Sequence, residues 1–253
     1  MKGETGKTLL VAFLLCIVCS VLVSGAAVKL KPLQEANKKL DVKKNLLVAA
    51  GMVNSTATKE EIDSAYSNVT PLLVDLATGD IVEGDIENYD QKKAAKDPKQ
   101  NLMIESADDF GGIKMRAKIA KAYLVKEAGE TKMIVLPVHG KGLWSTMYGF
   151  LVLEPSTTTV KGIGYYAHGE TPGLGGEIDN PTWKASWTGK KILDENFEPV
   201  LKVVKGAAKT ETEIDGLSGA TLTANGVSGT IKYWLGENGF GPFLAKFRDG
   251  GIQ

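Results

Sequence analysis

Residues 122–167 read AYLVKEAGETKMIVLPVHGKGLWSTMYGFLVLEPSTTTVKGIGYYA, and they contain most of the strand-like sequence in the chain. Short runs rich in Val, Ile, Leu, Tyr and Phe alternate there with segments of Gly, Pro and charged residues, a pattern typical of consecutive β-strands joined by turns. A further run of this kind follows near residue 200. We therefore expect a mixed or antiparallel sheet with strands at residues 122–126, 133–138, 148–154, 159–167 and 200–205.

Helical patterns lie on both sides of these strands. Residues 224–235 have apolar side chains at helical spacing and follow a turn of small residues, whereas a glycine-rich tail ends the chain. Thr58 and Glu61 have the spacing of a capping box, which predicts that a short helix begins there. Residues 78–106 are polar and are expected to form loops and a short strand. The expected fold class is α+β, a sheet domain with flanking helices.

The N-terminal apolar run from Thr8 to Val28 contains no charged residue and has about the ~20 residues that a helix needs to cross a bilayer. A cleaved signal peptide is the alternative, because residues 24–27 are small, but signal-peptide cores are usually only ~7–15 residues long. We therefore expect one uncleaved transmembrane helix, followed by a helix at 33–50 that ends near Gly51. The expected division of the chain is an anchor at 1–30, a helical and loop region packing on the domain at 31–110, and a ligand-binding domain at 111–253.

Charge and cysteine content exclude several classes of protein. The chain has 30 Lys and Arg against 30 Asp and Glu, and no basic stripe with interleaved aromatic residues follows residue 50, so nucleic-acid binding is not expected. Both cysteines, Cys16 and Cys19, lie in the apolar run; their CxxC spacing suggests redox or metal chemistry, but we favour small apolar residues that face lipid. The histidines, His139 and His168, have no partner pair at metal-ligand spacing, so no metal site is expected.

Residues 215–223, DGLSGATLT, place three hydroxyl side chains and two glycines immediately ahead of the expected helix. Glycine lets the backbone approach a ligand closely, and the first amides of a helix have no partner within it, so such a turn can receive a phosphate. The same hydroxyls have an ordinary structural use, because threonine caps helices. On the residues alone, both interpretations stay open. The candidate phosphate-binding residues are Ser218, Gly219, Ala220, Thr221 and Thr223.

Two other glycine-rich segments adjoin the expected strands: residues 168–176, HGETPGLGG, and residues 140–149, GKGLWSTMYG. Taken alone, the segment at 168–176 is compatible with an ordinary turn between strands. The first contains His168 near Glu170, a combination that by itself suggests an acid–base pair. The second contains Trp144, which is either the wall of a ligand site or a core aromatic residue.

The sequence SGATLT at 218–223, followed by ANGV, resembles the attachment motif of the covalent FMN-binding domain family, which occurs in two related respiratory ion pumps. In that family the last threonine of the motif forms a phosphoester with FMN, which implies covalent FMN on Thr223 and an FMN-binding domain at 111–253. The sequence ETPGLG resembles the loop beside the flavin, with a side chain packed on the flat face of the ring and His168 at most at its edge. The resemblance implies cofactor contacts from Glu170, Thr171, Leu174 and Gly175.

The stretch GKGLWSTMYG at 140–149 and the stretch KLKPLQEANKKLDVKKNLL at 29–47 resemble the C subunits of the sodium-translocating NADH:quinone reductases. The alternative is the G subunits of the ferredoxin:NAD reductase pumps, which share the flavin motif but match these flanks less well. This resemblance makes Trp144 a candidate wall of the flavin site. Lys205, in a VVKG turn, is a candidate positive charge for the reduced ring or the phosphate; an exposed lysine at a strand end is the alternative.

The function that the resemblance implies is that of an electron-relay flavoprotein subunit in a membrane complex that couples NADH oxidation and ubiquinone reduction to sodium export. No residue beyond the flavin is expected to be catalytic, and NADH is expected to be oxidised in another subunit because the chain has no dinucleotide-binding glycine motif. The expected partners are the other subunits, membrane lipid and the flavin transferase that loads the cofactor. The family places the domain on the periplasmic side of the bacterial inner membrane, whereas the lysines that follow the span predict the cytoplasm by the positive-inside rule. Two other functions compete with this one: a membrane-anchored module that binds a phosphate-bearing ligand noncovalently, and a structural assembly subunit.

Overall fold

The computed structural model describes residues 2–252, with the side chains of residues 5–252. The chain forms two compact units, one up to Val42 and one from Lys43 onwards. Helix α1 (Lys2–Ala49) contains both the expected transmembrane segment and the expected helix at 33–50, and its stretch Thr5–Ala49 is long and apolar enough to cross a membrane. Pro32 lies inside α1. It removes one helical hydrogen bond without ending the helix, because strong helix formers stand on both sides of it.

The second unit contains a five-stranded sheet, which confirms the expected α+β class. Every pair of neighbouring strands in this sheet is antiparallel. The four strands expected between residues 122 and 167 are all present, and a fifth strand that precedes them in the chain pairs with β4 at one edge. In spatial order the strands are β1 (Val69–Asp75), β4 (Ile119–Glu127), β5 (Glu130–Lys141), β6 (Thr146–Leu153) and β7 (Val160–Ala167).

Three details of the sequence-based prediction are wrong or incomplete. The expected strand at 200–205 is only β8 (Lys202–Val203), which pairs in parallel with β9 (Glu213–Ile214) outside the main sheet. The glycine-rich C-terminal tail contains a helix that was not anticipated, α6 (Gly241–Arg248), which buries Phe243 and Leu244. Strand β1 was not anticipated; it contains Pro71, which a strand at the edge of a sheet tolerates.

The remaining elements are short. The capping box is confirmed: Thr58 Oγ1 accepts a hydrogen bond from the Glu61 amide at 3.3 Å, and Glu61 Oε2 accepts one from the Thr58 amide at 2.8 Å. It begins helix α2 (Lys59–Tyr66). Residues 78–106 form loops with one short strand, as expected, and also one turn of helix. The other short elements are α3 (Gln91–Ala94), β2 (Asn101–Met103), β3 (Met115–Ala117), the 3₁₀ helix η1 (Gly175–Asp179) and α4 (Pro181–Ala185).

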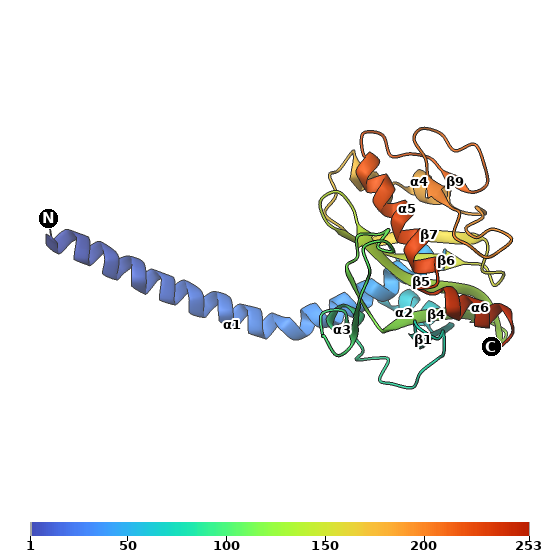
Figure 1. Ribbon diagram of the computed structural model, residues 1–253. Coiled ribbons are helices and arrows are strands. Elements are labelled where there is room, and N and C mark those ends of the chain that lie inside the picture. Colours follow the sequence, from blue (N-terminus) through green and yellow to red (C-terminus); the bar gives the residue numbers. More distant parts are fainter. Residues whose placement is uncertain (1, 253) are drawn as a thin grey trace. The chain divides into compact units, whose positions relative to one another are not determined.

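Both faces of the sheet are covered. Helix α5 (Thr221–Leu235) packs on one face, against β5 (Figure 1). Leu136 of β5 and Ile231 of α5 both belong to the buried hydrophobic core. On the other face the last turn of α1 lies against β7, where a Cβ on Gly162 would stand 2.3 Å from the Ala49 carbonyl oxygen. Glycine at this position therefore permits the close approach of helix and strand. The sheet is thus packed on both faces. The segment 142–145 lies between the end of β5 and the start of β6, and the glycine-rich segment 168–176 follows the end of β7.

Candidate functional site

The carboxylate of Glu170 is the centre of a buried hydrogen-bond network. Glu170 follows β7, and the pairing of Tyr148 with Ala167 brings this segment beside the turn that joins β5 to β6. Three consecutive backbone amides of that turn, from Leu143, Trp144 and Ser145, each donate a hydrogen bond of 3.0 Å to the carboxylate. The Ser145 hydroxyl adds a longer bond of 3.3 Å, and Glu170 is only 5% exposed.

Glycine at position 142 is required by this turn. The turn is closed by a hydrogen bond of 2.8 Å from the Gly142 amide to the Ser145 carbonyl oxygen. A Cβ on Gly142 would lie 2.6 Å from Glu170 Oε1, so any larger side chain would push the carboxylate out of its place. The GKGLWS sequence therefore forms a cradle for a carboxylate, a role that its glycine and serine content alone did not predict.

Thr223 belongs to the same network. Its Oγ1 donates a hydrogen bond of 2.6 Å to Glu170 Oε2, and the residue is only 1% exposed. Helix α5 begins at Thr221 rather than at the expected Ala224, with Ala220 as its N-cap. Thr223 is therefore the third residue of the helix and not its cap, and its hydroxyl bonds to a residue from another segment instead of to the helix backbone.

The segment at 168–176 is held by further side-chain contacts. His168 Nε2 lies 2.7 Å from Asp179 Oδ2, and His168 Nδ1 accepts a hydrogen bond of 3.2 Å from the Glu170 amide. The Ser145 hydroxyl accepts one of 2.6 Å from the Gly169 amide. His168 thus orients the backbone before Glu170, and its ring does not contact the Glu170 carboxylate as an acid–base pair would require. The sequence analysis did not single out Ser145, although it lies in the GKGLWSTMYG stretch, or Asp179, which follows the HGETPGLGG segment.

Four large apolar side chains near this network are exposed, although large apolar residues are more often buried. They come from three segments: the β5–β6 turn, the tip of the segment after β7, and the first turn of α5. Leu174 and Leu222 are 43% and 60% exposed, and a Cβ on Gly219 would lie 2.8 Å from Leu174 Cδ2. Trp144 is 67% exposed, so the interpretation of it as a core aromatic is wrong. These four residues form what we call the apolar rim: Leu143, Trp144, Leu174 and Leu222.

The other candidate residues differ in their exposure. Ser218, Gly219, Thr221 and Thr171 are exposed, whereas Ala220 and Gly175 are buried. Gly175 lies directly against the network, because a Cβ there would stand 2.5 Å from Thr223 Oγ1. Lys205 is exposed in a turn whose Gly206 carbonyl oxygen accepts a hydrogen bond from the Gly216 amide at 2.7 Å. The structure therefore joins Glu170, Gly175 and Thr223, and leaves Lys205 on a neighbouring surface turn.

The carboxyl group of Glu170 is ionised over a wide pH range. Burial by itself raises the pKa of Glu170, but the hydrogen bonds from the Thr223 hydroxyl and from the Trp144, Ser145 and Leu143 amides outweigh it and lower the pKa below its ordinary value. The network thus holds a carboxylate anion. None of the hydrogen bonds described for this carboxylate comes from a lysine or an arginine.

This shift predicts a loss of stability in acid. Above the ordinary pKa of 4.5 the group is ionised in both the folded and the unfolded chain, and the network contributes its full stabilisation. Below about pH 4.5 the unfolded chain takes up the proton first, so the stabilisation is lost as the pH falls through the lower pKa of the folded chain. We expect urea titrations between about pH 6 and pH 3 to show a free energy of unfolding that falls less steeply in Glu170→Gln than in the wild type. A difference between the two proteins that stays constant with pH contradicts this assignment.

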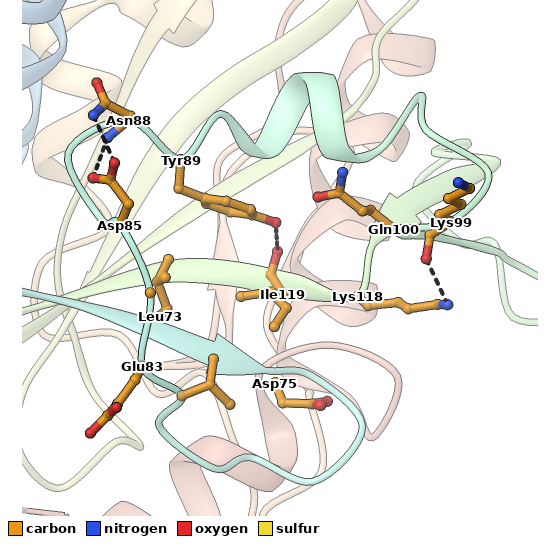
Figure 2. A pocket seen from close by; sticks show the side chains of 12 residues that line it. Leu73, Asp75, Glu83, Asp85, Asn88, Tyr89, Lys99, Gln100, Lys118 and Ile119 are labelled. Atoms are coloured by element: carbon orange, nitrogen blue, oxygen red, sulfur yellow. Dashed lines mark hydrogen bonds between the residues drawn. The ribbon is translucent and has the colours of Figure 1, made fainter.

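A separate pocket of ≈ 540 Å³ lies between the edge of the sheet and the loop that follows β1 (Figure 2). Tyr89 crosses it and donates a hydrogen bond of 2.7 Å to the Ile119 carbonyl oxygen. Charged side chains of both signs line it, including Asp85 and Lys118. None of the candidate residues named from the sequence lines this pocket.

Comparison with known proteins bears on the same region. The model of the FMN-binding domain family matches residues 142–236, which include the β5–β6 turn from Gly142, the segment after β7 and the whole of α5. The chain is 51% identical to the C subunit of the Na(+)-translocating NADH-quinone reductase of Vibrio vulnificus, over 98% of this chain and 97% of that protein. It is 45% identical to the C subunit of the Yersinia pestis reductase of the same name, over 100% of this chain and 96% of that protein.

Two solved structures have a similar fold. The crystal structure of Shewanella oneidensis NqrC matches with a TM-score of 0.79 and 34% identity, over 85% of this chain and 99% of that one. The crystal structure of the C subunit of the Na(+)-translocating NADH-quinone reductase from Parabacteroides distasonis matches with a TM-score of 0.67 and 27% identity, over 85% of this chain and 96% of that one.

Proposed function

Because this chain belongs to the family of C subunits of the Na(+)-translocating NADH-quinone reductases, we propose that it is an electron-relay flavoprotein with FMN joined through a phosphoester to Thr223. The observation that carries the proposal is the hydrogen bond of 2.6 Å between Thr223 Oγ1 and Glu170 Oε2, which joins two segments of the family's sequence pattern at one atom pair. Among the three hydroxyls of the SGATLT motif, only Thr223 is buried at this junction.

The residues around Thr223 fit a flavin phosphate. Thr223 lies in the first turn of α5, where the leading backbone amides have no carbonyl partner within the helix and the helix dipole favours an anion. Its hydroxyl is covered by the backbone at Gly175, so attachment requires the tip of the segment after β7 to move aside. Gly173, with a φ of +74°, gives that tip a backbone conformation that side chains other than glycine disfavour.

The side chains of the apolar rim are suited to pack against a flavin ring. When bound, FMN supplies the electron-transfer chemistry, and the link through the phosphate leaves the electronics of the ring to the surrounding protein. Trp144 and Leu174 are exposed apolar side chains, and packing of a flavin ring against them would remove water from the ring. The exposed positions of these side chains are consistent with a surface that gains its partner only when the cofactor is present.

The proposal includes a membrane location and partners. We propose that α1 crosses the inner membrane once and that the unit from Lys43 onwards lies on the periplasmic side, in contact with lipid through α1 and with the other subunits of the reductase. A flavin transferase is the proposed source of the attached FMN. The lysines after the span oppose this orientation by the positive-inside rule, but that rule is a statistical bias that assembly with other subunits can override.

The simplest test is denaturing electrophoresis of the full chain, produced with a flavin transferase and viewed under ultraviolet light. We expect a fluorescent band at the position of the chain, because a phosphoester survives unfolding. A chain that binds its ligand noncovalently, or one that serves only in assembly, gives no fluorescent band. Fluorescence that is lost on denaturation of a freshly purified yellow protein contradicts the covalent link while leaving a flavin-binding role.

A further inference from the structure

We infer that Glu170 orients the Thr223 hydroxyl for attachment of the flavin phosphate and accepts its proton as the new bond forms. The inference rests on the proposed function, since it concerns how the same site acquires its cofactor. The hydrogen bond of 2.6 Å from Thr223 Oγ1 to Glu170 Oε2 has the length typical of a hydroxyl bound to an ionised carboxylate. Because the hydroxyl proton points to Glu170 Oε2, the lone pairs of Thr223 Oγ1 are available to bond to the phosphorus atom of the flavin donor.

The carboxylate is fixed well enough to orient the hydroxyl. Its Oε1 accepts from Trp144 and Ser145, and its Oε2 accepts from Leu143 as well as from Thr223. Three of these donors are backbone amides of a tight turn, so the carboxylate cannot rotate without breaking several hydrogen bonds at once. The amides of the turn already donate hydrogen bonds to both carboxylate oxygens. The further bond from Thr223 is therefore not needed to hold the carboxylate, and its effect is to orient the threonine hydroxyl.

The covering and the orienting parts of the segment are different. Gly175 lies over Thr223 Oγ1, and Leu174 beside it is 43% exposed at the tip of the segment. Glu170 stands at the base of the segment and is bound to the β5–β6 turn. The tip can therefore move away to admit a donor while the carboxylate keeps its hold on the hydroxyl.

The attachment step is a group transfer without oxidation or reduction. Its donor is a flavin whose FMN phosphate is part of a phosphoanhydride, as in a flavin dinucleotide. The bond between Thr223 Oγ1 and phosphorus forms, the anhydride P–O bond breaks, and the departing mononucleotide keeps the bridging oxygen. The hydroxyl proton passes to Glu170 Oε2 and then to the departing phosphate. Because the hydroxyl becomes strongly acidic as its oxygen bonds to phosphorus, a carboxylate with a lowered pKa still accepts this proton.

The experiment compares flavin attachment to the wild-type full chain, Glu170→Gln and Glu177→Gln, using purified flavin transferase and flavin adenine dinucleotide. Glu177 is the matched control, because it lies in the same segment and its carboxylate accepts from Asn180 at 2.8 Å instead of from Thr223. In Glu170→Gln the side-chain amide donates where the carboxylate accepted, so the Thr223 hydroxyl loses its acceptor. We expect kcat for attachment to fall about 10²-fold with KM for the acceptor chain unchanged, and Glu177→Gln to behave as the wild type.

The possible results separate the two proposals. A wild-type chain that acquires no covalent flavin overturns the proposed function and this role of Glu170 together. Normal attachment to Glu170→Gln, a change in KM alone, or an equal loss in Glu177→Gln overturns only the role of Glu170. If Glu170→Gln does not fold, Glu170→Asp takes its place: its carboxylate is one methylene further from Thr223, and it should also lower kcat without changing KM, whereas wild-type kcat overturns the inference.

Discussion

Replacing Thr223 by alanine is expected to abolish covalent FMN while the chain stays folded. Attachment needs the hydroxyl oxygen itself, and the other hydroxyls of the motif belong to the exposed residues Ser218 and Thr221, whereas the Thr223 hydroxyl is the one that donates to the Glu170 carboxylate. Because Thr223 is not the cap of α5, the cost to stability comes from the lost buried hydrogen bond, about 1–3 kcal/mol, and not from an uncapped helix. Peptide mass spectrometry of protein from a host with a flavin transferase measures the loss directly.

Three matched variants control this result. Ser218→Ala and Thr221→Ala should retain covalent FMN, since neither removes the oxygen that meets Glu170. Thr223→Ser keeps a hydroxyl at the same place and should retain attachment at a reduced rate, because the loss of the methyl group frees the side chain to rotate. FMN found on the Thr223→Ala chain, at whatever residue, is the result that contradicts the assignment.

Much of the sheet could be predicted because each strand carries its own local signal. The runs that became β4, β5, β6 and β7 are apolar, rich in β-branched and aromatic residues, and separated by glycine or proline. Helix α6 was missed for the opposite reason: the glycines around it hide a start signal, Pro242 in its first turn, and only packing of Phe243 and Leu244 in the core fixes it as a helix. The local sequence pattern was sufficient to predict the strands, whose residues favour that structure by themselves, and insufficient for α6, which depends on tertiary packing.

The contacts within the candidate site could not be predicted from local sequence patterns. The motifs drew attention to Glu170 and Thr223, but the hydrogen bond between them joins residues that are 53 positions apart in the chain. It depends on the register of β6 with β7, which sets the segment after β7 beside the β5–β6 turn. The alternative that a hydroxyl of this turn caps the helix fails at Thr223 for the same reason, since its hydroxyl donates to a distant carboxylate and α5 begins at Thr221, three residues before the expected Ala224.

Replacing Gly226 by alanine is expected to destabilise the chain, although the same change in an open helix would stabilise it. Alanine favours helix by ~1 kcal/mol over glycine. In α5, however, a Cβ on Gly226 would stand 2.1 Å from the Lys141 carbonyl oxygen, and a Cβ on Gly229 would stand 1.8 Å from the Phe110 carbonyl oxygen. Both obstacles are backbone atoms, so the helix has to move away from the end of β5 in the first case and from the loop at Phe110 in the second. Overpacking of this kind costs about 1–3 kcal/mol or more, which outweighs the gain in helix propensity.

The expected result is a lower urea midpoint for Gly226→Ala and for Gly229→Ala, with Asn225→Ala as the control. Asn225 is exposed on the same helix, so its replacement should leave the midpoint unchanged or raise it slightly. Gly226→Ala should also slow flavin attachment, because Lys141 directly precedes the turn whose amides hold Glu170. If Gly226→Ala unfolds at the same urea concentration as the wild type, or at a higher one, the predicted clash between α5 and the end of β5 is contradicted.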